Sequence, residues 1–230
     1  MSRHVSALVL LVCHLLAAPA PVKDAKPHSE ASPTQPARGR LLVASHRLAD
    51  PNFSETVVLL FAYEPAGAMG VVINRPTDVR LGSVLRDVEE LRNRSDPVYL
   101  GGPVAGNLLI FLVRAAEQPE SSQPILDGVY VSGSRATLLK ALNEDKSKKR
   151  VRAYAGYAAW APGQLDREMA RGDWHIAAAD ATTVFDMTAS AMWPKLIQQF
   201  SGEWTRRETP TEVSYSKMQV EQAALAHSVD

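Results

Sequence analysis

The sequence predicts an α/β protein of the α+β-like kind, a single compact domain in which helices pack on one mixed β-sheet. Apolar runs rich in β-branched residues alternate irregularly with stretches of helical periodicity, and short turns join several of these runs as hairpins. A regular strand–helix alternation would instead predict a parallel sheet. A length of 230 residues, 46% of them apolar, suits one domain with a proper core.

The first part of the predicted sheet is a short strand followed by a hairpin. Residues 40–45 (RLLVAS) form the short strand, and residues 49–55 (ADPNFSE) form a turn because an Asp-Pro step starts turns. Residues 56–64 are apolar enough for a strand buried on both faces. Residues 69–74 are the next strand, so the pattern over 56–74 predicts a hairpin.

Helical periodicity and further strands follow. Leu81, Val84, Leu85 and Val88 recur at the spacing of one helix face, which predicts an amphipathic helix over residues 81–91. Three strand-forming runs come next, at residues 97–102, 107–115 and 127–134. The glycine pair between the first two runs fits a turn better than an anion-binding nest, since no lysine accompanies it.

The last part of the domain combines helices and strands. Ser134 is placed to cap a helix over residues 134–145, and Pro162 and Gly172 are placed to begin and end another. A capping serine beside a solvated Arg135 is favoured there over an anion site. The remaining elements are strands at residues 151–160 and 173–179 and a helix at residues 192–202.

Both ends of the chain are predicted to lie outside the domain of residues 39–204. Residues 1–20 combine a short basic start, an apolar run and the small residues AAPA, which is typical of a signal peptide. A proline follows each candidate cleavage alanine, so an uncleaved membrane anchor stays open. Residues 21–38 contain four prolines and predict a disordered tether, and residues 205–230 form a polar tail. We expect an exported or anchored protein, and a cytoplasmic one if the leader is misread.

Composition excludes several kinds of function. Lysine plus arginine equals aspartate plus glutamate at 25 each, so no overall charge attracts nucleic acid. The basic run KSKKRVR has no interleaved aromatic residues and predicts a solvated turn. Cys13 is the only cysteine, and His46 and His175 stand apart from any metal-binding spacing. No G-x-S-x-G motif is present. We therefore expect no cofactor and no metal.

The stretch GAMGVVINRP combines a glycine pair with an arginine. Gly67 and Gly70 precede a strand and lack the lysine of a phosphate loop, so they predict a tight hairpin. Asn74 and Arg75 follow that strand. An arginine there can bind a carboxylate or phosphate through two parallel hydrogen bonds, or it can hold a loop by donating to backbone carbonyls. The second interpretation is favoured.

Aromatic residues gather where the 151–160 strand meets the next helix. Tyr154, Tyr157, Trp160 and Gln164 belong to the stretch YAGYAAWAPGQL, which suits a ligand pocket, an interface anchor or simple core packing. On the following helix, Asp166 and Glu168 stand two residues apart and do not share a face, so they are not a catalytic carboxylate pair.

In the order GRLLVAS, ADPNFSETVVLL, GAMGVVINRP, VYLGGPV, DGVYVSGS and YAGYAAWAPGQLDREMARGDW, these motifs resemble the YqgE/AlgH family of bacterial proteins. The resemblance covers about residues 39–200. It implies a compact mixed α/β domain and carries no established activity, although members have been described as regulators of transcription. The chain has Ala159 and Ala161 where the family usually has glycines, so a left-handed backbone at either position would be strained. Its leader is a second departure from family members, which are expected in the cytoplasm.

The function predicted from these observations is binding without catalysis. The expected partner is an unknown protein or a small anionic ligand. Nucleic acid is not expected, and a membrane is expected only through the N-terminal segment. The candidate site consists of Asn74, Arg75, Tyr157, Trp160 and Gln164. Two alternatives stay open: a regulator of transcription, and a hydrolase or transferase acting on an anionic metabolite.

Overall fold

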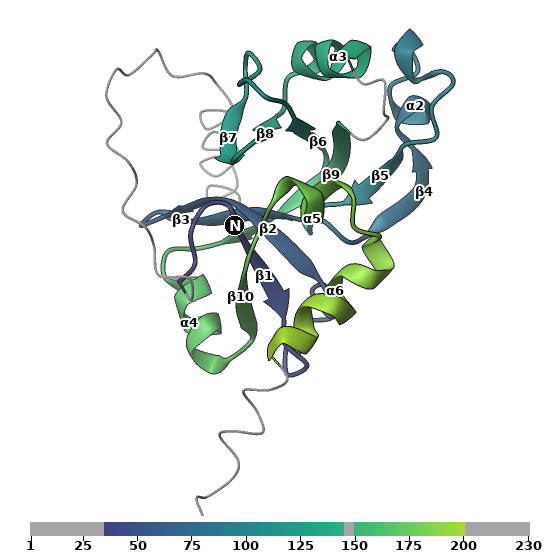
Figure 1. Ribbon diagram of the computed structural model, residues 1–230. Coiled ribbons are helices and arrows are strands. Elements are labelled where there is room, and N and C mark those ends of the chain that lie inside the picture. The colour runs from purple at the N-terminus through teal and green to yellow at the C-terminus, as the bar shows by residue number, and fades with distance from the viewer. Residues whose placement is uncertain (1–34, 145–149, 201–230) are drawn as a thin grey trace, which may run out of the picture.

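The computed structural model describes residues 35–144 and 150–200 and shows one domain with a strongly curled sheet (Figure 1). The strands are β1 (Arg40–Ala44), β2 (Val57–Glu64), β3 (Gly67–Val72), β4 (Pro76–Arg80), β5 (Pro97–Leu100), β6 (Val104–Arg114), β7 (Gln123–Leu126), β8 (Val129–Ser132), β9 (Val151–Trp160) and β10 (Trp174–Ala178). The predicted leader, most of the predicted tether and the tail lie outside the described residues.

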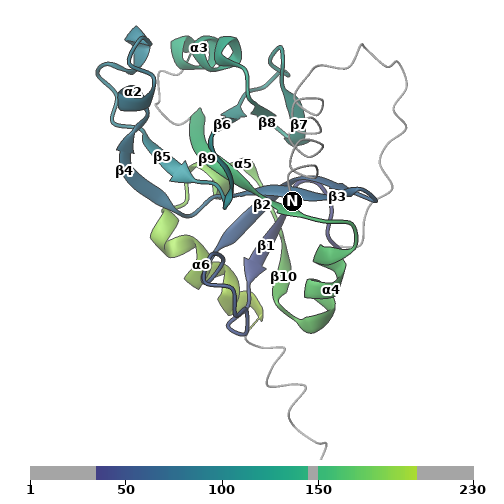
Figure 2. The same ribbon diagram turned by 180° about the vertical axis from the view of Figure 1, so that it is seen from behind.

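Helices cover the two ends of this sheet. They are α2 (Leu81–Val84), α3 (Arg135–Glu144), α4 (Gln164–Arg171), α5 (Ala181–Phe185) and α6 (Ala189–Ile197), with short 3-10 turns η1 (Glu89–Leu91) and η2 (Gln198–Phe200). Seen from both sides, α4 and α6 flank the end of the sheet that holds β1 and β10, while α2 and α3 lie at the other end (Figure 1, Figure 2). No described helix is long and apolar enough to cross a membrane.

The long strand β9 organises the sheet. The strand order is β10-β1-β2-β3-β9-β6-β8-β7, and β4 and β5 are attached beside this path. β6 pairs with one edge of β9, while the other edge pairs antiparallel with β3 near its end and parallel with β5 near its start. The other pairs among the described strands are antiparallel, so the sheet is mixed, as the sequence predicts.

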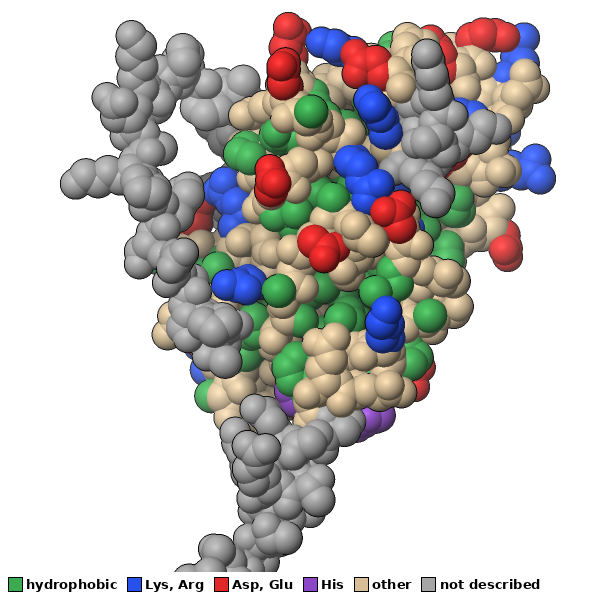
Figure 3. All heavy atoms as spheres, viewed as in Figure 1, with side chains coloured by type: hydrophobic (Ala, Val, Ile, Leu, Met, Phe, Trp, Pro, Cys, Tyr) green, Lys and Arg blue, Asp and Glu red, His purple; other side chains and the backbone are tan. Residues whose placement is uncertain are grey.

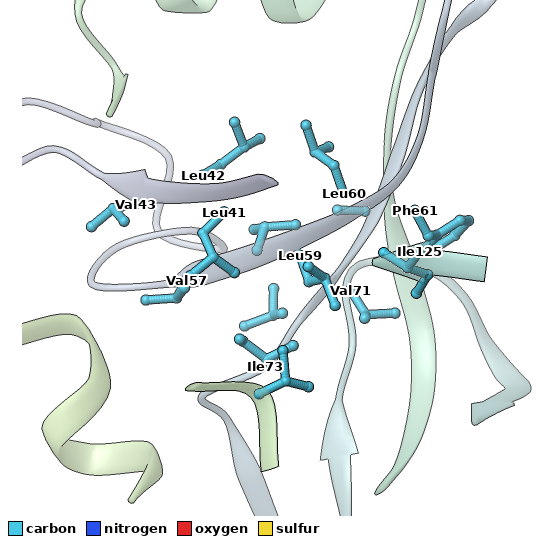
Figure 4. Packing of buried hydrophobic residues seen from close by; sticks show 14 of the residues in the cluster. Leu41, Leu42, Val43, Val57, Leu59, Leu60, Phe61, Val71, Ile73 and Ile125 are labelled. Atoms are coloured by element: carbon cyan, nitrogen blue, oxygen red, sulfur yellow. The ribbon is translucent and has the colours of Figure 1, made fainter. Parts of the chain in front are cut away.

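The hairpin predicted over residues 56–74 is confirmed and supplies the centre of the core. β2 and β3 pair antiparallel, and successive residues of β2 are buried on both faces of the sheet. Leu42 and Leu60 point to one side of the strands, whereas Leu41 and Leu59 point to the other (Figure 4). A strand covered on both faces needs an unbroken apolar run, which is what this sequence provides.

The single helix predicted over residues 81–91 is wrong. The chain instead forms α2, turns at Leu85 and makes the 3-10 turn η1. Leu81, Val88 and Leu91 are buried as predicted, but Val84 is 47% exposed. A side chain at Gly82 would come within 2.9 Å of the Leu91 carbonyl oxygen, so the segment folds back on itself. The compact turn buries the same apolar residues that a helix would have buried.

Other element boundaries differ locally. The helix predicted from Pro162 begins at Gln164, because Gly163 adopts a left-handed conformation with φ of 66°. Gly172 ends it as predicted, with φ of 79° and an N–H that bonds back to the last turn. The last helix begins at Ala189, three residues before the predicted start. The sequence reading missed three short elements, namely β4, β7 and α5.

Two glycine segments cross at the centre of the sheet. Added side chains at Gly101 and Gly102 would lie 2.2–2.3 Å from backbone atoms of Gly156 and Tyr157 in β9. Gly156 itself has φ of 71°. The predicted turn at Gly101-Gly102 is therefore a place of close backbone approach, which only glycine permits.

Candidate functional site

Arg75 holds the loop of residues 49–55 against the sheet. Its Nη1 atom donates a hydrogen bond to the Asn52 carbonyl oxygen at 2.5 Å, and its Nη2 atom donates to the Ser54 carbonyl oxygen at 2.9 Å. The favoured interpretation of this arginine, that it fixes a loop through backbone carbonyls, is confirmed. The fork geometry of the guanidinium lets one side chain bind two carbonyls of the same loop.

Asn74 forms hydrogen bonds with the end of the same loop. Its Oδ1 atom accepts a hydrogen bond from the Val57 backbone N–H at 2.9 Å, and its Nδ2 atom donates to the Glu55 carbonyl oxygen at 2.9 Å. Glu55 has a left-handed backbone with φ of 55°. The amide side chain thus takes the place of a strand partner where the loop turns into β2.

The loop carries Phe53 onto two tryptophans. The Phe53 ring stacks on Trp160 at the end of β9, with centroids 6.0 Å apart and planes at 26°. It meets Trp174 of β10 edge-on at 5.6 Å, and the two indoles meet each other edge-on at 6.0 Å. Phe53 is partly exposed while the tryptophans are buried, so the loop forms a cover over the indole pair.

One carboxylate joins the two tryptophans. Glu168 Oε2, from α4, accepts hydrogen bonds from Trp160 Nε1 at 2.8 Å and from Trp174 Nε1 at 2.9 Å. Its Oε1 atom accepts from Gln164 Nε2 at 2.9 Å, and the Gln164 Oε1 atom accepts from the Ala161 backbone N–H at 3.1 Å. Within the described residues no arginine or lysine pairs with Glu168.

A hollow of about 360 Å³ opens beside this network, between the loop and α4. Aromatic, charged and small side chains share its lining, which consists of Arg47, Leu48, Ala49, Asp50, Phe53, Ala159, Trp160, Gln164, Glu168, Arg171, Asp173 and Trp174. Its volume lies in the usual range of small-ligand pockets. We call it the aromatic hollow.

The five predicted site residues have three different placements. Trp160 and Gln164 line the aromatic hollow, and Asn74 and Arg75 hold the loop that forms its wall. Tyr157 is 1% exposed and lies within the core, where burial raises the pKa of its hydroxyl. Four of the five therefore belong to one structural unit, either as lining or as support.

Sequence reasoning missed Phe53, Trp174 and Glu168. Glu168 lies one turn after Gln164, a spacing at which helix side chains meet, and this was the available signal. Asp166 and Glu168 have different hydrogen-bond partners, which agrees with the prediction that they do not share a helix face. Asp166 accepts a hydrogen bond from the Tyr63 hydroxyl at 2.5 Å, which raises the pKa of Tyr63 to about 12.

Ala159 and Ala161 adopt no left-handed backbone, since the described non-glycine residues with positive φ are Glu55, Ala105 and Ser121. The strain that alanine would bring at such a conformation does not arise. Ala159 is instead one of the residues that line the aromatic hollow.

Other residues considered in the sequence are engaged elsewhere. Arg135 forms a bidentate ion pair with Asp87, with nitrogen–oxygen distances of 2.6 and 3.2 Å. Ser134 caps the start of α3. The rings of His46 and His175 pack on Trp193 and Phe200 respectively. The described part of the chain contains no cluster of three or more potential metal-binding side chains.

Comparison with known proteins places the chain within one family of similar sequence and fold. The model of the AlgH-like family matches residues 41–205. The UPF0301 protein of Chlorobium luteolum is 33% identical over 169 residues, which is 73% of this chain and 88% of that protein. A UPF0301 protein of Xanthomonas campestris pv. campestris is 35% identical, over 69% of this chain and 86% of its own length.

Two solved structures resemble this one. The solution structure of the AlgH protein from Pseudomonas aeruginosa has 26% sequence identity and a TM-score of 0.58, covering 83% of this chain and 97% of that one. A crystal structure from Corynebacterium diphtheriae has 24% identity and a TM-score of 0.58, covering 77% and 90% of the two chains, and shows likeness of fold alone.

Proposed function

We propose that this chain, which belongs to the AlgH-like family, binds a partner protein or small ligand at the aromatic hollow without catalysing a reaction. The observation that supports this most is the construction of the hollow. Three aromatic rings, a carboxylate with three hydrogen bonds and a doubly fastened loop come from four separate segments of the chain. Such a preorganised arrangement lowers the cost of binding.

The polar groups of the hollow favour binding over catalysis. Glu168 is committed to two indoles and an amide, and both ends of the Gln164 amide are occupied. Asp173 accepts two hydrogen bonds from Arg171, at 2.6 and 3.0 Å. A general base needs an open acceptor position toward the proton that it removes, and structural partners take most of these positions on Glu168, Gln164 and Asp173.

We also propose that the protein acts outside the cytoplasm, exported or anchored by its first segment. The support is the leader-like pattern of residues 1–20. Fractionation of the native host, with the mature N-terminus read by mass spectrometry, tests this. We expect a processed or membrane-bound protein. An intact cytoplasmic protein would contradict the proposal and favour regulation of transcription.

Filling the hollow tests the binding function. A host strain from which the gene for this protein is deleted is complemented with each variant. Each strain is then grown in competition with the wild type, under conditions in which the wild type outgrows the deletion strain. Ala159→Leu enlarges a residue of the lining, and we expect the strain that carries it to be outgrown by the wild type, as the deletion strain is. Ala170→Leu, on an exposed position of α4 outside the lining, is the matched control and should compete normally. An Ala159→Leu protein of unchanged Tm that competes like wild type would refute the proposal.

A further inference from the structure

We propose that the ligand of the aromatic hollow presents a guanidinium group to Glu168, an inference that rests on the proposed function. The first reason is charge. The Glu168 carboxylate carries three hydrogen bonds from neutral donors and pairs with no described cation. Because a partly buried carboxylate gains most from a cationic partner, the site favours a ligand that brings one.

The Glu168 carboxylate has one acceptor position left for such a donor. A carboxylate offers about four acceptor positions. Oε2 accepts from both indoles, and Oε1 accepts from Gln164 alone, so one position remains on Oε1. Because Glu168 lines the hollow, a single N–H group of a bound guanidinium can occupy this position.

The aromatic walls favour a flat cation. Guanidinium groups stack on aromatic faces and are attracted by the ring quadrupole. The fold already uses this contact elsewhere, with Arg114 over the Phe185 ring at 5.1 Å and Arg152 over the Tyr99 ring at 5.0 Å. Phe53 brings such a ring to the hollow, because it is partly exposed, whereas Trp160 and Trp174 are 5% and 2% exposed and lie behind it.

The other charges of the hollow agree with this assignment. Its lining holds three acids and two arginines, and one of these arginines, Arg171, pairs with Asp173 two residues later in the chain. Asp50 accepts one hydrogen bond, from the Asn52 backbone N–H at 2.8 Å, through a single oxygen. Arg75, the residue from which an anionic ligand was expected, donates to two loop carbonyls instead. Its guanidinium is therefore committed to the loop.

Calorimetric titration with a matched pair of compounds tests the proposal. N-acetyl-arginine amide carries the guanidinium, and N-acetyl-citrulline amide is its neutral counterpart of the same shape. We expect the arginine compound to bind about tenfold tighter or better, as one charge-assisted contact implies. Equal binding of the two compounds, or binding of neither, would overturn the proposal.

Variants show whether Glu168 is responsible. Glu168→Gln keeps an acceptor for the indoles and removes the charge, so we expect it to lose the preference for arginine over citrulline. Asp166→Asn removes a charge two residues away, outside the lining, and should keep the preference. If Glu168→Gln does not fold, Ala159→Leu tests instead whether the arginine compound binds in the hollow, because it enlarges a residue of the lining and leaves Glu168 in place. An unchanged arginine preference in a folded Glu168→Gln or Ala159→Leu protein would contradict the proposal.

Two further compounds distinguish the source of the guanidinium. Agmatine represents a free small molecule, and a blocked pentapeptide with a central arginine represents a side chain of a partner protein. Tighter binding of the pentapeptide supports a partner protein, and tighter binding of agmatine supports a small ligand. If neither compound binds while Ala159→Leu still fails in the host, the guanidinium inference is wrong and the binding function stands.

Discussion

Arg75 is the residue that keeps the wall of the aromatic hollow in place. Its two hydrogen bonds end on carbonyls of a loop that has no strand partner of its own. We expect Arg75→Ala to lower the free energy of unfolding by about 1–2 kcal/mol, since hydrogen bonds from charged donors are lost at a partly exposed position. Arg80→Ala, on an exposed position of β4 with no side-chain partner described, should change it by less than about 0.5 kcal/mol. Chemical denaturation measures both.

The mobility of the 49–55 loop provides a second measurement of the effect of Arg75→Ala. Hydrogen exchange of the backbone amides near Phe53 should become faster in Arg75→Ala, because local opening then costs less. Exchange in β2, which is buried on both faces, should stay slow. Unchanged exchange near Phe53 would show that the loop does not depend on Arg75.

Glu168 is the second residue on which the site depends. We expect Glu168→Ala to lower the free energy of unfolding by about 2–3 kcal/mol, because the indole N–H groups of two buried tryptophans lose their acceptor. Glu168→Gln should cost less, about 1 kcal/mol, because an amide oxygen can still accept from an indole. Thermal unfolding followed by tryptophan fluorescence compares them. Equal stability of Glu168→Ala and wild type would mean that the carboxylate does not hold the indoles.

Among single residues, those that support the candidate site could be predicted from the sequence better than those at its centre. Four residues could be selected because amide, guanidinium and indole groups after strands usually have specific partners. They are Asn74, Arg75, Trp160 and Gln164. Glu168 and Trp174 could not, because the bond between them joins a helix and a strand whose relative placement depends on the turn at Gly172. Phe53 could not be selected either, since only the hold of Arg75 on its loop brings it to the indoles.

Among the elements, β9 and the crossing glycines are the most sensitive to change. Gly156→Ala would add a Cβ atom 2.6 Å from the Gly102 carbonyl oxygen and 2.7 Å from that of Val104, at φ of 71°. We expect a loss of about 3 kcal/mol or more in the free energy of unfolding. Gly106→Ala meets nothing within 4 Å and should be close to neutral. Similar stability of the two variants would contradict the close approach of these segments.

The short helix α5 depends on its capping aspartate. Asp180 Oδ1 accepts a hydrogen bond from the Thr183 backbone N–H at 2.6 Å, and this bond lowers the pKa of the Asp180 carboxyl. A folded-state pKa below the unfolded value means that the stabilisation is present above about pH 4 and is lost as pH falls through the folded-state pKa. We expect Asp180→Ala to cost about 1 kcal/mol at pH 7 and progressively less as the pH falls below about 4.

The control for this prediction is Asp78→Ala, on an exposed position of β4 with no described side-chain partner. Denaturation at pH 7 should show a change of less than about 0.5 kcal/mol for it, against about 1 kcal/mol for Asp180→Ala. A difference between Asp180→Ala and wild type that stays constant from pH 7 to pH 2 would mean that the cap does not act through its carboxylate.

Elements were predictable where the sequence pattern and the tertiary contacts agree. β1, β2, β3 and β9 are apolar, β-branched runs and form as expected. The 81–91 segment has a helical pattern but does not form one helix. Gly82 lets the chain fold back onto Leu91, so the apolar side chains are buried by a compact turn instead. β4 is exposed along most of its length and carries no hydrophobic signal; its pairing with β5 alone makes it a strand.

For the whole molecule, the fold class and the family follow from the sequence, while the curl of the sheet does not. Within the curled sheet, one edge of β9 pairs first with β5 and then with β3, and glycines allow the close backbone approach beside it. The curled sheet then brings the 49–55 loop, the end of β9, α4 and the start of β10 together around one hollow. Charge is spread without a single-sign field on the face shown in Figure 3, where acidic and basic side chains are interspersed.

The most direct measurement of the central claim, that the aromatic hollow binds a ligand, is photo-crosslinking in the native host. A benzophenone amino acid is placed at Arg171 on the rim, or at Ala170 beside it and outside the lining. After illumination, mass spectrometry of the purified protein detects any coupled molecule, small or large. We predict a defined product from position 171 that is absent from position 170 and is lost when Ala159→Leu fills the hollow. Equal products from both positions, or a product that persists with Ala159→Leu, would contradict the claim.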